Sequence, residues 1–176
     1  RDMLEAFTAL HETGRTRVGP ESWRLAFVGG ADAASREYTL GVRRAAQGIP
    51  VDVQINKPRS VVEDTLRSAS IYWHGTGYGE DPKRHPERFE HFGIAVVEAM
   101  LAGAVPVVFG GAGPAEIVRH GVDGFHWHTL DELADRTTEL MNDAEKRRAM
   151  SESAVARARE FSIERFRSAV DSTIQR

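Results

Sequence analysis

One apolar run, residues 94–102, limits what this chain can fold into more than any other feature. All of its residues except Glu98 are apolar and compatible with a helix, and Gly93 interrupts the polar segment before it. We therefore predict a helix that begins near Phe92 or Gly93. A lone carboxylate in a helix that faces a parallel sheet is costly to bury, so Glu98 needs a partner or ligand hydroxyls.

The residues after this run have the pattern of a buried strand followed by a glycine turn. Residues 103–109 are almost entirely apolar, and the glycine-rich residues 110–113 lead into a short second helix. Helix, strand and helix in this order are typical of a parallel sheet covered on both faces. We predict the α/β class, as a Rossmann-like three-layer sandwich with a mostly parallel sheet.

The start of the predicted helix is suited to an anion. The first N–H groups of a helix have no internal partner and carry the positive end of its dipole, and Gly93 lets an anion approach closely. Seven residues separate Glu90 from Glu98, so one acid precedes this start and another follows it.

These residues belong to a longer pattern, which resembles one protein family. The pattern consists, in chain order, of Glu90, Glu98, Ala99-Met100, Gly103, Pro106-Val107, Gly110-Gly111 and Glu116. It resembles the C-terminal, donor-binding domain of retaining glycosyltransferases of the GT-B fold, family 4 (glycosyl transferases group 1). The joined pattern runs from Phe89 to Gly124, and the looser resemblance covers nearly the whole chain. The polar segment from Trp73 to Glu87 is most similar to the branch that handles lipid-linked or surface oligosaccharides.

The resemblance implies a role for each site residue. Glu90 is the expected catalytic residue and accepts hydrogen bonds from hydroxyls of the donor sugar. The backbone of Phe92, Gly93 and Ile94 is expected to hold the diphosphate, and Glu98 to bind the ribose hydroxyls. No metal and no cofactor are implied, because a GDP- or UDP-linked sugar is the substrate. The alternatives are a solvated loop acid for Glu90 and a buried salt bridge for Glu98.

The resemblance also implies the reaction and the partners. A hexosyltransferase-type enzyme would move the sugar to a glycan or lipid-linked acceptor with retention of configuration. Residues 1–176 would then be the nucleotide-sugar donor-binding domain, without its first strand and without the N-terminal acceptor domain, and inactive alone. Two alternatives stay open: a non-hydrolysing sugar-nucleotide epimerase of GT-B shape, and a non-catalytic nucleotide-sugar-binding module.

Composition restricts the partners further. The 176 residues carry a net charge of −3, which argues against a nucleic-acid partner. No apolar run is long enough to span a bilayer, and the absence of cysteine fits a reducing compartment. We expect a cytoplasmic protein, held at the inner face of the membrane if the missing half associates with it peripherally.

The rest of the chain reads as alternating helices and strands. We expect strands at 24–28, 51–55, 70–73 and 125–127, a loop at 13–21, and helices at 2–12, 35–47, 60–68, 129–141, 143–160 and from 161 onward. Capping boxes are predicted at Ser60–Glu63 and Thr129–Glu132.

Several side chains on these helices are expected to face inward. On the helix at 35–47 they are Tyr38, Val42 and Ala45, and on the last helix Phe166 and Val170. The alternative for Phe161 and Phe166 is a surface that faces the missing domain.

Three further expectations concern the surroundings of the site. By the resemblance, Ile55 and Asn56 contact the nucleotide base through their backbone, with turn chemistry as the alternative for Asn56. The long loop from His74 to Phe89 lies over the site and is a candidate lid. A metal site of His74, His85 and His91 is rejected, because their spacing fits no helix face.

Overall fold

The fold is a parallel α/β arrangement in which helices and strands alternate along the chain. The computed structural model describes residues 2–13 and 23–174, so the predicted loop at 13–21 lies almost wholly outside the described residues. The elements, in chain order, are α1 (Asp2–Glu12), β1 (Leu25–Gly29), α2 (Arg36–Ala45), β2 (Val51–Ile55), α3 (Arg59–Ser68), β3 (Ile71–His74), η2 (Pro86–Arg88), α4 (Ile94–Leu101), β4 (Val105–Phe109), α5 (Gly113–Ile117), β5 (Phe125–Trp127), α6 (Leu130–Asn142), α7 (Ala144–Ala158), η3 (Arg159–Phe161) and α8 (Ile163–Ile174).

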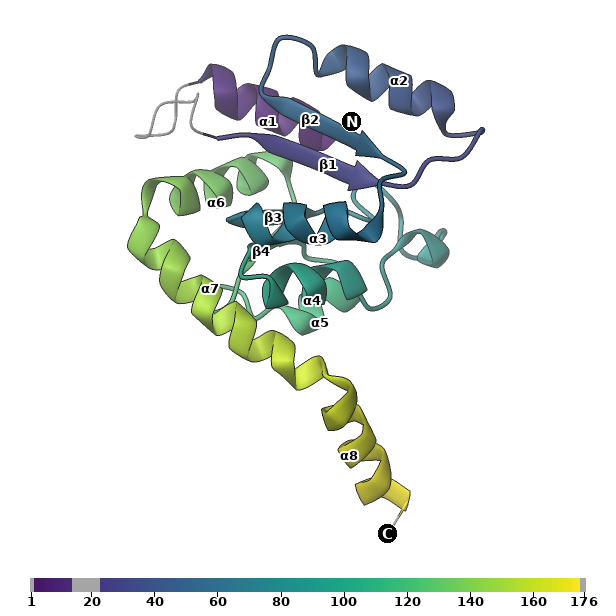
Figure 1. Cartoon of the computed structure of the whole chain (residues 1–176), viewed down its shortest axis with the longest axis vertical. Helices are drawn as coiled ribbons and strands as arrows, with labels where there is room; N and C mark the ends of the chain where they lie inside the picture. Colours follow the sequence, from purple (N-terminus) through teal and green to yellow (C-terminus); the bar gives the residue numbers. More distant parts are fainter. Residues whose placement is uncertain (1, 14–22, 175–176) are drawn as a thin grey trace.

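The strands form two parallel sheets. Strand β1 pairs with β2, and β4 lies between β3 and β5 (Figure 1). Within the described residues no ladder joins β1 to β3, so each of these strands has one edge without a partner. The observed strands agree with the predicted ones to within two residues. The shift of β3 by one residue brings His74 into the strand.

Helices cover both faces of the β3–β4–β5 sheet. On one face α1 and α6 pack against Val105, Val107 and Trp127. On the other face α4 and α5 pack against Val108 and Tyr72. Successive residues of a strand point to opposite faces, which explains why neighbouring valines of β4 enter different cores. The predicted three-layer α/β sandwich is confirmed.

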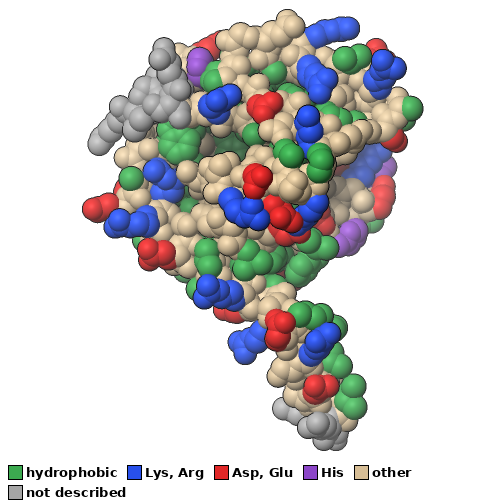
Figure 2. Space-filling model, viewed as in Figure 1, with side chains coloured by type: hydrophobic (Ala, Val, Ile, Leu, Met, Phe, Trp, Pro, Cys, Tyr) green, Lys and Arg blue, Asp and Glu red, His purple; other side chains and the backbone are tan. Residues whose placement is uncertain are grey.

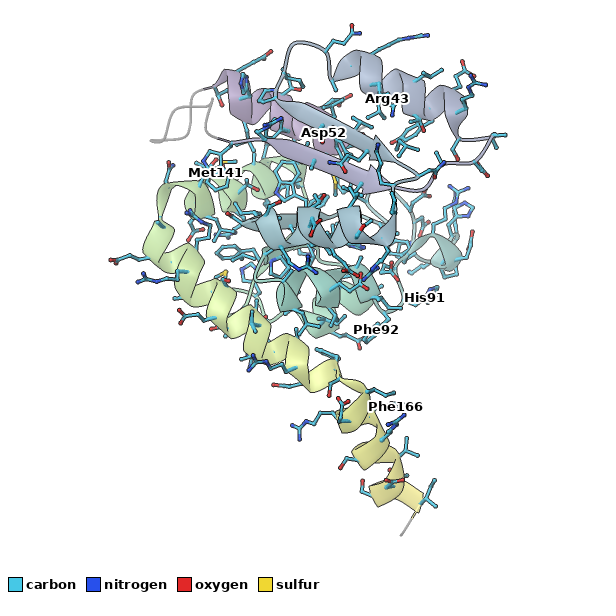
Figure 3. The ribbon with its side chains drawn as sticks, in the orientation of Figure 1. Arg43, Asp52, His91, Phe92, Met141 and Phe166 are labelled. Carbon is cyan, nitrogen blue, oxygen red and sulfur yellow. The ribbon has the colours of Figure 1, made fainter. Side chains whose placement is uncertain are left out.

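The last helix leaves the body of the molecule. Figure 1 shows α8 projecting away from the sheets, and Phe166 lies on this projection in Figure 3. Phe166 and Val170 are exposed, so the prediction that they face inward was wrong. Phe161 packs against the core beside α4, and the chain turns outward after it into α8.

The inward face of α2 was also predicted wrongly. Tyr38 and Ala45 are exposed, whereas Val42 is half-buried and Ala46 is buried. This helix accompanies the two-stranded sheet, where there is little core to bury a wide apolar face. Its orientation is therefore set by Val42 and Ala46 rather than by the aromatic ring.

One of the two predicted capping boxes is present. The hydroxyl of Thr129 accepts a hydrogen bond from the amide of Glu132 at 3.2 Å and caps α6. The prediction for Ser60 was wrong, because α3 begins at Arg59 directly after Pro58 and has no side-chain cap. Glu63, the other half of that predicted box, forms an ion pair with Arg59 instead.

Candidate functional site

Helix α4 begins with a left-handed glycine and without a side-chain cap. Gly93 has φ of 100° and ψ of 55°, a conformation that only glycine adopts freely. Its carbonyl accepts from the amides of Val96 and Val97, whereas no described group accepts from the amides of Ile94 and Ala95. Ile94 is 67% exposed and Ala95 is exposed as well, whereas Gly93 itself is buried. The predicted helix start is confirmed, because α4 begins at Ile94 directly after Gly93.

The loop before α4 is held in place by a second glycine. The amide of Gly113 donates to the carbonyl of Glu90 at 3.0 Å. A Cβ on Gly113 would lie 2.2 Å from the carbonyl oxygen of His91 and 2.7 Å from the Cα of Phe92. The glycine turn before α5 therefore lets two backbone segments meet beneath the helix end. Figure 3 shows the labelled His91 and Phe92 at the surface of this loop.

Strain is concentrated at the same turn. Ala112 has φ of 55° and ψ of −147°, a region of backbone space that belongs almost entirely to glycine. Such a residue costs on the order of 1–3 kcal/mol and persists only where its surroundings fix it. The contact between Gly113 and the Glu90 loop supplies that fixation.

Both predicted acids lie near strand β3. Burial raises the pKa of Tyr72 to about 12, and the negative charges of Glu90 and Glu98 contribute to this rise. Tyr72 and His74 are two residues apart on one strand and therefore share a face. Glu90 thus lies beside His74, and α4, which carries Glu98, packs on the face of β3 that carries Tyr72.

His74 is a buried polar neighbour of Glu90. Its side chain is 8% exposed, and its Nε2 lies 3.9 Å from a carboxylate oxygen of Glu90. Its Nδ1 is buried without a hydrogen-bond partner in the described chain. Burial lowers the pKa of His74, and the charge of Glu90 opposes that shift only partly. The ring is therefore neutral at pH 7.

Glu98 has a partner that the sequence did not indicate. Both of its oxygens face the guanidinium of Arg59 at the start of α3, with Nη2–Oε1 at 2.5 Å and Nη1–Oε2 at 3.3 Å. The sequence offered a buried salt bridge as the alternative role of Glu98. A salt bridge is present, but it is not buried. In Figure 2 basic and acidic side chains lie next to each other over α3. No pattern linked Arg59 to an acid 39 residues away.

The two residues predicted to contact a nucleotide base lie at the end of β2. The side-chain amide of Asn56 donates to the carbonyl of Ala31 at 2.8 Å and accepts from its N–H at 2.9 Å. The backbone N–H of Asn56 donates to Gly29. Turn chemistry therefore accounts for this side chain and this N–H, and a base contact through the carbonyls of Ile55 or Asn56 stays a prediction.

The segment between β3 and α4 is anchored to the body. The ring of Tyr78 lies 5.0 Å from that of Trp127 and 5.7 Å from that of Phe109. Arg88 donates to both carboxylate oxygens of Glu80, at 2.9 and 3.0 Å. These contacts give the segment a defined path, and its role as a lid stays a prediction.

A cavity of about 370 Å³ lies at the end of β3. Trp73, His74, Tyr78 and Trp127 are among its lining residues, together with Met3 of α1, but none of the predicted site residues lines it. Across residues 2–13 and 23–174, no three metal-ligating side chains come together.

The fold is that of a Rossmann-like domain of the GT-B type, and along its sequence Glu90 precedes the start of α4 and Glu98 follows it. A sequence profile described as "Glycosyl transferases group 1" matches residues 1–157. The chain belongs to this glycosyltransferase family. The predicted family and fold are both confirmed.

Two curated relatives show how much of a longer protein the chain matches. The GDP-Man:Man(3)GlcNAc(2)-PP-Dol alpha-1,2-mannosyltransferase of Dictyostelium discoideum is 34% identical over 156 residues, which are 85% of this chain and 29% of that protein. The sucrose synthase of Acidithiobacillus caldus is 28% identical over 142 residues, 77% of this chain and 18% of that protein. The chain thus spans less than a third of these relatives.

Solved structures show the same fold. HepE of Anabaena in complex with UDP superimposes with a TM-score of 0.74 at 21% identity, over 94% of this chain and 43% of that one. The C-terminal domain of LpcC, a glycosyl transferase group 1 protein from Francisella tularensis, gives a TM-score of 0.70 at 13% identity, over 91% and 77%. Within the described residues, no helix has both the length and the apolar character that a membrane crossing needs.

Proposed function

We propose that this chain is the donor-binding half of a retaining hexosyltransferase, which moves a sugar from a nucleoside diphosphate to a glycan or lipid-linked acceptor. The observation that carries the proposal is the open start of α4, with free amides at Ile94 and Ala95, between Glu90 and Glu98. An unpaired helix terminus favours a diphosphate, and ionised carboxylates accept strongly from sugar hydroxyls.

Each part of the site then has one task. The amides from Phe92 to Ile94 hold the diphosphate and stabilise its charge as it departs. Glu98 accepts from the ribose hydroxyls, and Glu90 accepts from hydroxyls of the donor sugar and aligns its anomeric carbon. The contribution of this half to the rate is positioning and charge stabilisation.

The transfer step is balanced without a further reactant. The bond between the anomeric carbon and the diphosphate oxygen breaks, and its electron pair leaves with the nucleoside diphosphate. The acceptor oxygen forms the new bond to that carbon on the same face. The acceptor's proton moves to the departing phosphate oxygen.

We further propose that GDP-mannose is the donor. We also propose that one more parallel strand and an acceptor domain complete the protein. The name of the Dictyostelium relative supports guanosine and mannose, whereas HepE was solved with UDP. The unpaired edges of β1 and β3 suit a parallel strand between them. The chain matches only 29% of the Dictyostelium relative, which supports an acceptor domain outside this chain. Peripheral membrane attachment through that domain, in the cytoplasm, remains part of the proposal.

Calorimetry with GDP and UDP on the full-length protein tests the donor site. Glu98→Ala should weaken nucleotide binding about tenfold or more, because it removes hydrogen bonds to a charged acceptor. Glu90→Gln should lower sugar transfer while leaving the Kd of the nucleoside diphosphate nearly unchanged. The exposed acid Glu152 on α7 is the matched control, and Glu152→Ala should change neither quantity.

Two results would contradict the proposal. Absence of binding by both nucleotides would remove the donor site. Equal losses for Glu98→Ala and Glu152→Ala would show that the acid on α4 has no special role. Product analysis with a nucleotide sugar separates transfer from epimerisation, and binding without turnover by the full-length protein would favour a non-catalytic module.

A further inference from the structure

Arg59 connects two carboxylates that belong to different helices. Its Nε donates to Glu63 on α3 at 3.1 Å, while Nη1 and Nη2 donate to the two oxygens of Glu98 on α4. The guanidinium is planar and presents its donors in a fixed fork, so holding one edge orients the other. Glu63 therefore aims Arg59 at Glu98.

The contact contributes little to stability. The side chains of Arg59 and Glu98 are 60% and 29% exposed, so solvent screens their attraction and the ion pair adds little to the stability of the fold. Glutamate has three rotatable side-chain bonds, however, and fixing them in advance lowers the entropy that a ligand must overcome on binding. The geometric effect on Glu98 is therefore the larger consequence of the pair.

The pairing leaves room for a diol. An ionised carboxylate has about four acceptor positions, and the fork of Arg59 takes one on each oxygen. One position on each oxygen stays free. Two adjacent hydroxyls, such as those of a ribose, match this remaining capacity.

We propose that Arg59 is a positioning residue, which fixes the carboxylate of Glu98 for the 2′- and 3′-hydroxyls of the donor's ribose. This inference rests on the proposed function. It predicts that Arg59 acts on discrimination between ribose and deoxyribose, rather than on folding or on diphosphate binding.

The test compares ribonucleotides with their deoxy counterparts. Calorimetry on the full-length protein gives the Kd of UDP, 2′-deoxy-UDP, GDP and 2′-deoxy-GDP, and the base that binds more tightly supplies the ratio of deoxy to ribo Kd. The natural protein should show a ratio of roughly tenfold or more, because the lost bond has a charged acceptor. Arg59→Met should reduce the ratio to about threefold, and Glu98→Ala should bring it close to one.

Arg67 provides the matched control. It lies on the same helix, pairs with Glu63 and Asp64, and has a similar exposure to Arg59. Arg67→Met should leave the ratio as in the natural protein. Because the ratio compares two ligands on one variant, a partial loss of folded protein does not change it.

The outcomes separate this inference from the proposed function. A natural ratio in Arg59→Met, together with a collapsed ratio in Glu98→Ala, would overturn the role of Arg59 alone. A natural ratio in Glu98→Ala would overturn the ribose role of Glu98 and with it the inference, while nucleotide binding would stand. No binding by any of the four nucleotides would overturn both.

Discussion

The β3–β4–β5 sheet and the β1–β2 sheet have the same parallel pairing but very different surroundings. Strand β4 is buried along almost its whole length, between α1 and α6 on one face and α4 and α5 on the other. Strands β1 and β2 have no fully buried residue, and neither have α2 and α3. A parallel strand becomes a core strand only where both faces and both edges are covered, and in this chain the site motif lies on the covered sheet.

The largest test of this difference compares two leucines. Leu140 on α6 is fully buried, whereas Leu40 on α2 is 42% exposed. Leu140→Ala should lower the free energy of unfolding by about 2–5 kcal/mol, because it leaves a cavity in the core. Leu40→Ala should change it by less than about 1 kcal/mol. Urea denaturation measures both, and similar losses would mean that the two sheets are equally well packed.

A pair of glycines sharpens the comparison at the site. Gly113→Ala should cost about 1–3 kcal/mol of stability, because the new Cβ meets the backbone of the Glu90 loop. It should also weaken nucleotide binding by displacing the start of α4. Gly29→Ala in β1 meets nothing within 4 Å and should change stability by less than about 1 kcal/mol. Thermal unfolding measures the stability of both variants, and calorimetry measures their nucleotide binding. If Gly113→Ala changed neither, the close packing at this glycine would be refuted.

The smallest expected effect is a dependence of stability on pH near neutrality, which His74 brings to the covered sheet. Residues 23–68 contain no histidine, whereas His74 ends β3 and burial lowers its pKa below the ordinary 6.5. The unfolded chain then binds the proton more readily than the folded one. The stabilisation from neutral His74 is therefore complete above about pH 6.5 and decreases as the pH falls below it.

Urea midpoints at pH 7.5 and 5.5 measure this effect. His74→Gln should bring the two midpoints closer together. The corresponding change in the free energy of unfolding should be smaller than the loss expected for Leu140→Ala. The substitution should not abolish the difference, because burial also lowers the pKa of His120. An unchanged difference in His74→Gln would show that His74 does not link protonation to folding.

Sequence reasoning recovered the fold because local patterns decide most of it. The apolar run at 94–102, the strand at β4 and the glycine turn each carry their own period or conformational requirement, and all three were located to within two residues. The start of α4 at Gly93 followed from the same logic, since a residue without Cβ stands where φ is positive.

The errors came from features that depend on three-dimensional surroundings. Tyr38 was placed inward because a periodic pattern says which residues share a face, but not how much core that face meets. Phe166 was placed inward because nothing local shows that α8 leaves the body. Arg59 was missed because its contact with Glu98 exists only once α3 and α4 are side by side. The sequence analysis considered His74 only as part of a rejected metal site. Its position beside Glu90 depends on how β3 pairs with β4, which the sequence does not show.

The reciprocal bonds between Asn56 and Ala31 have a consequence for the far end of the β1–β2 sheet. A side-chain amide carries the same donor and acceptor as a peptide group, so Asn56 continues the ladder by one rung after the main chain has turned away. Aspartate would lose the donor and bring an oxygen against the carbonyl of Ala31, and glutamine is one methylene too long. A single carboxamide thus lengthens the pairing of β1 with β2 by one residue and ties together the two chain segments that leave the less covered sheet.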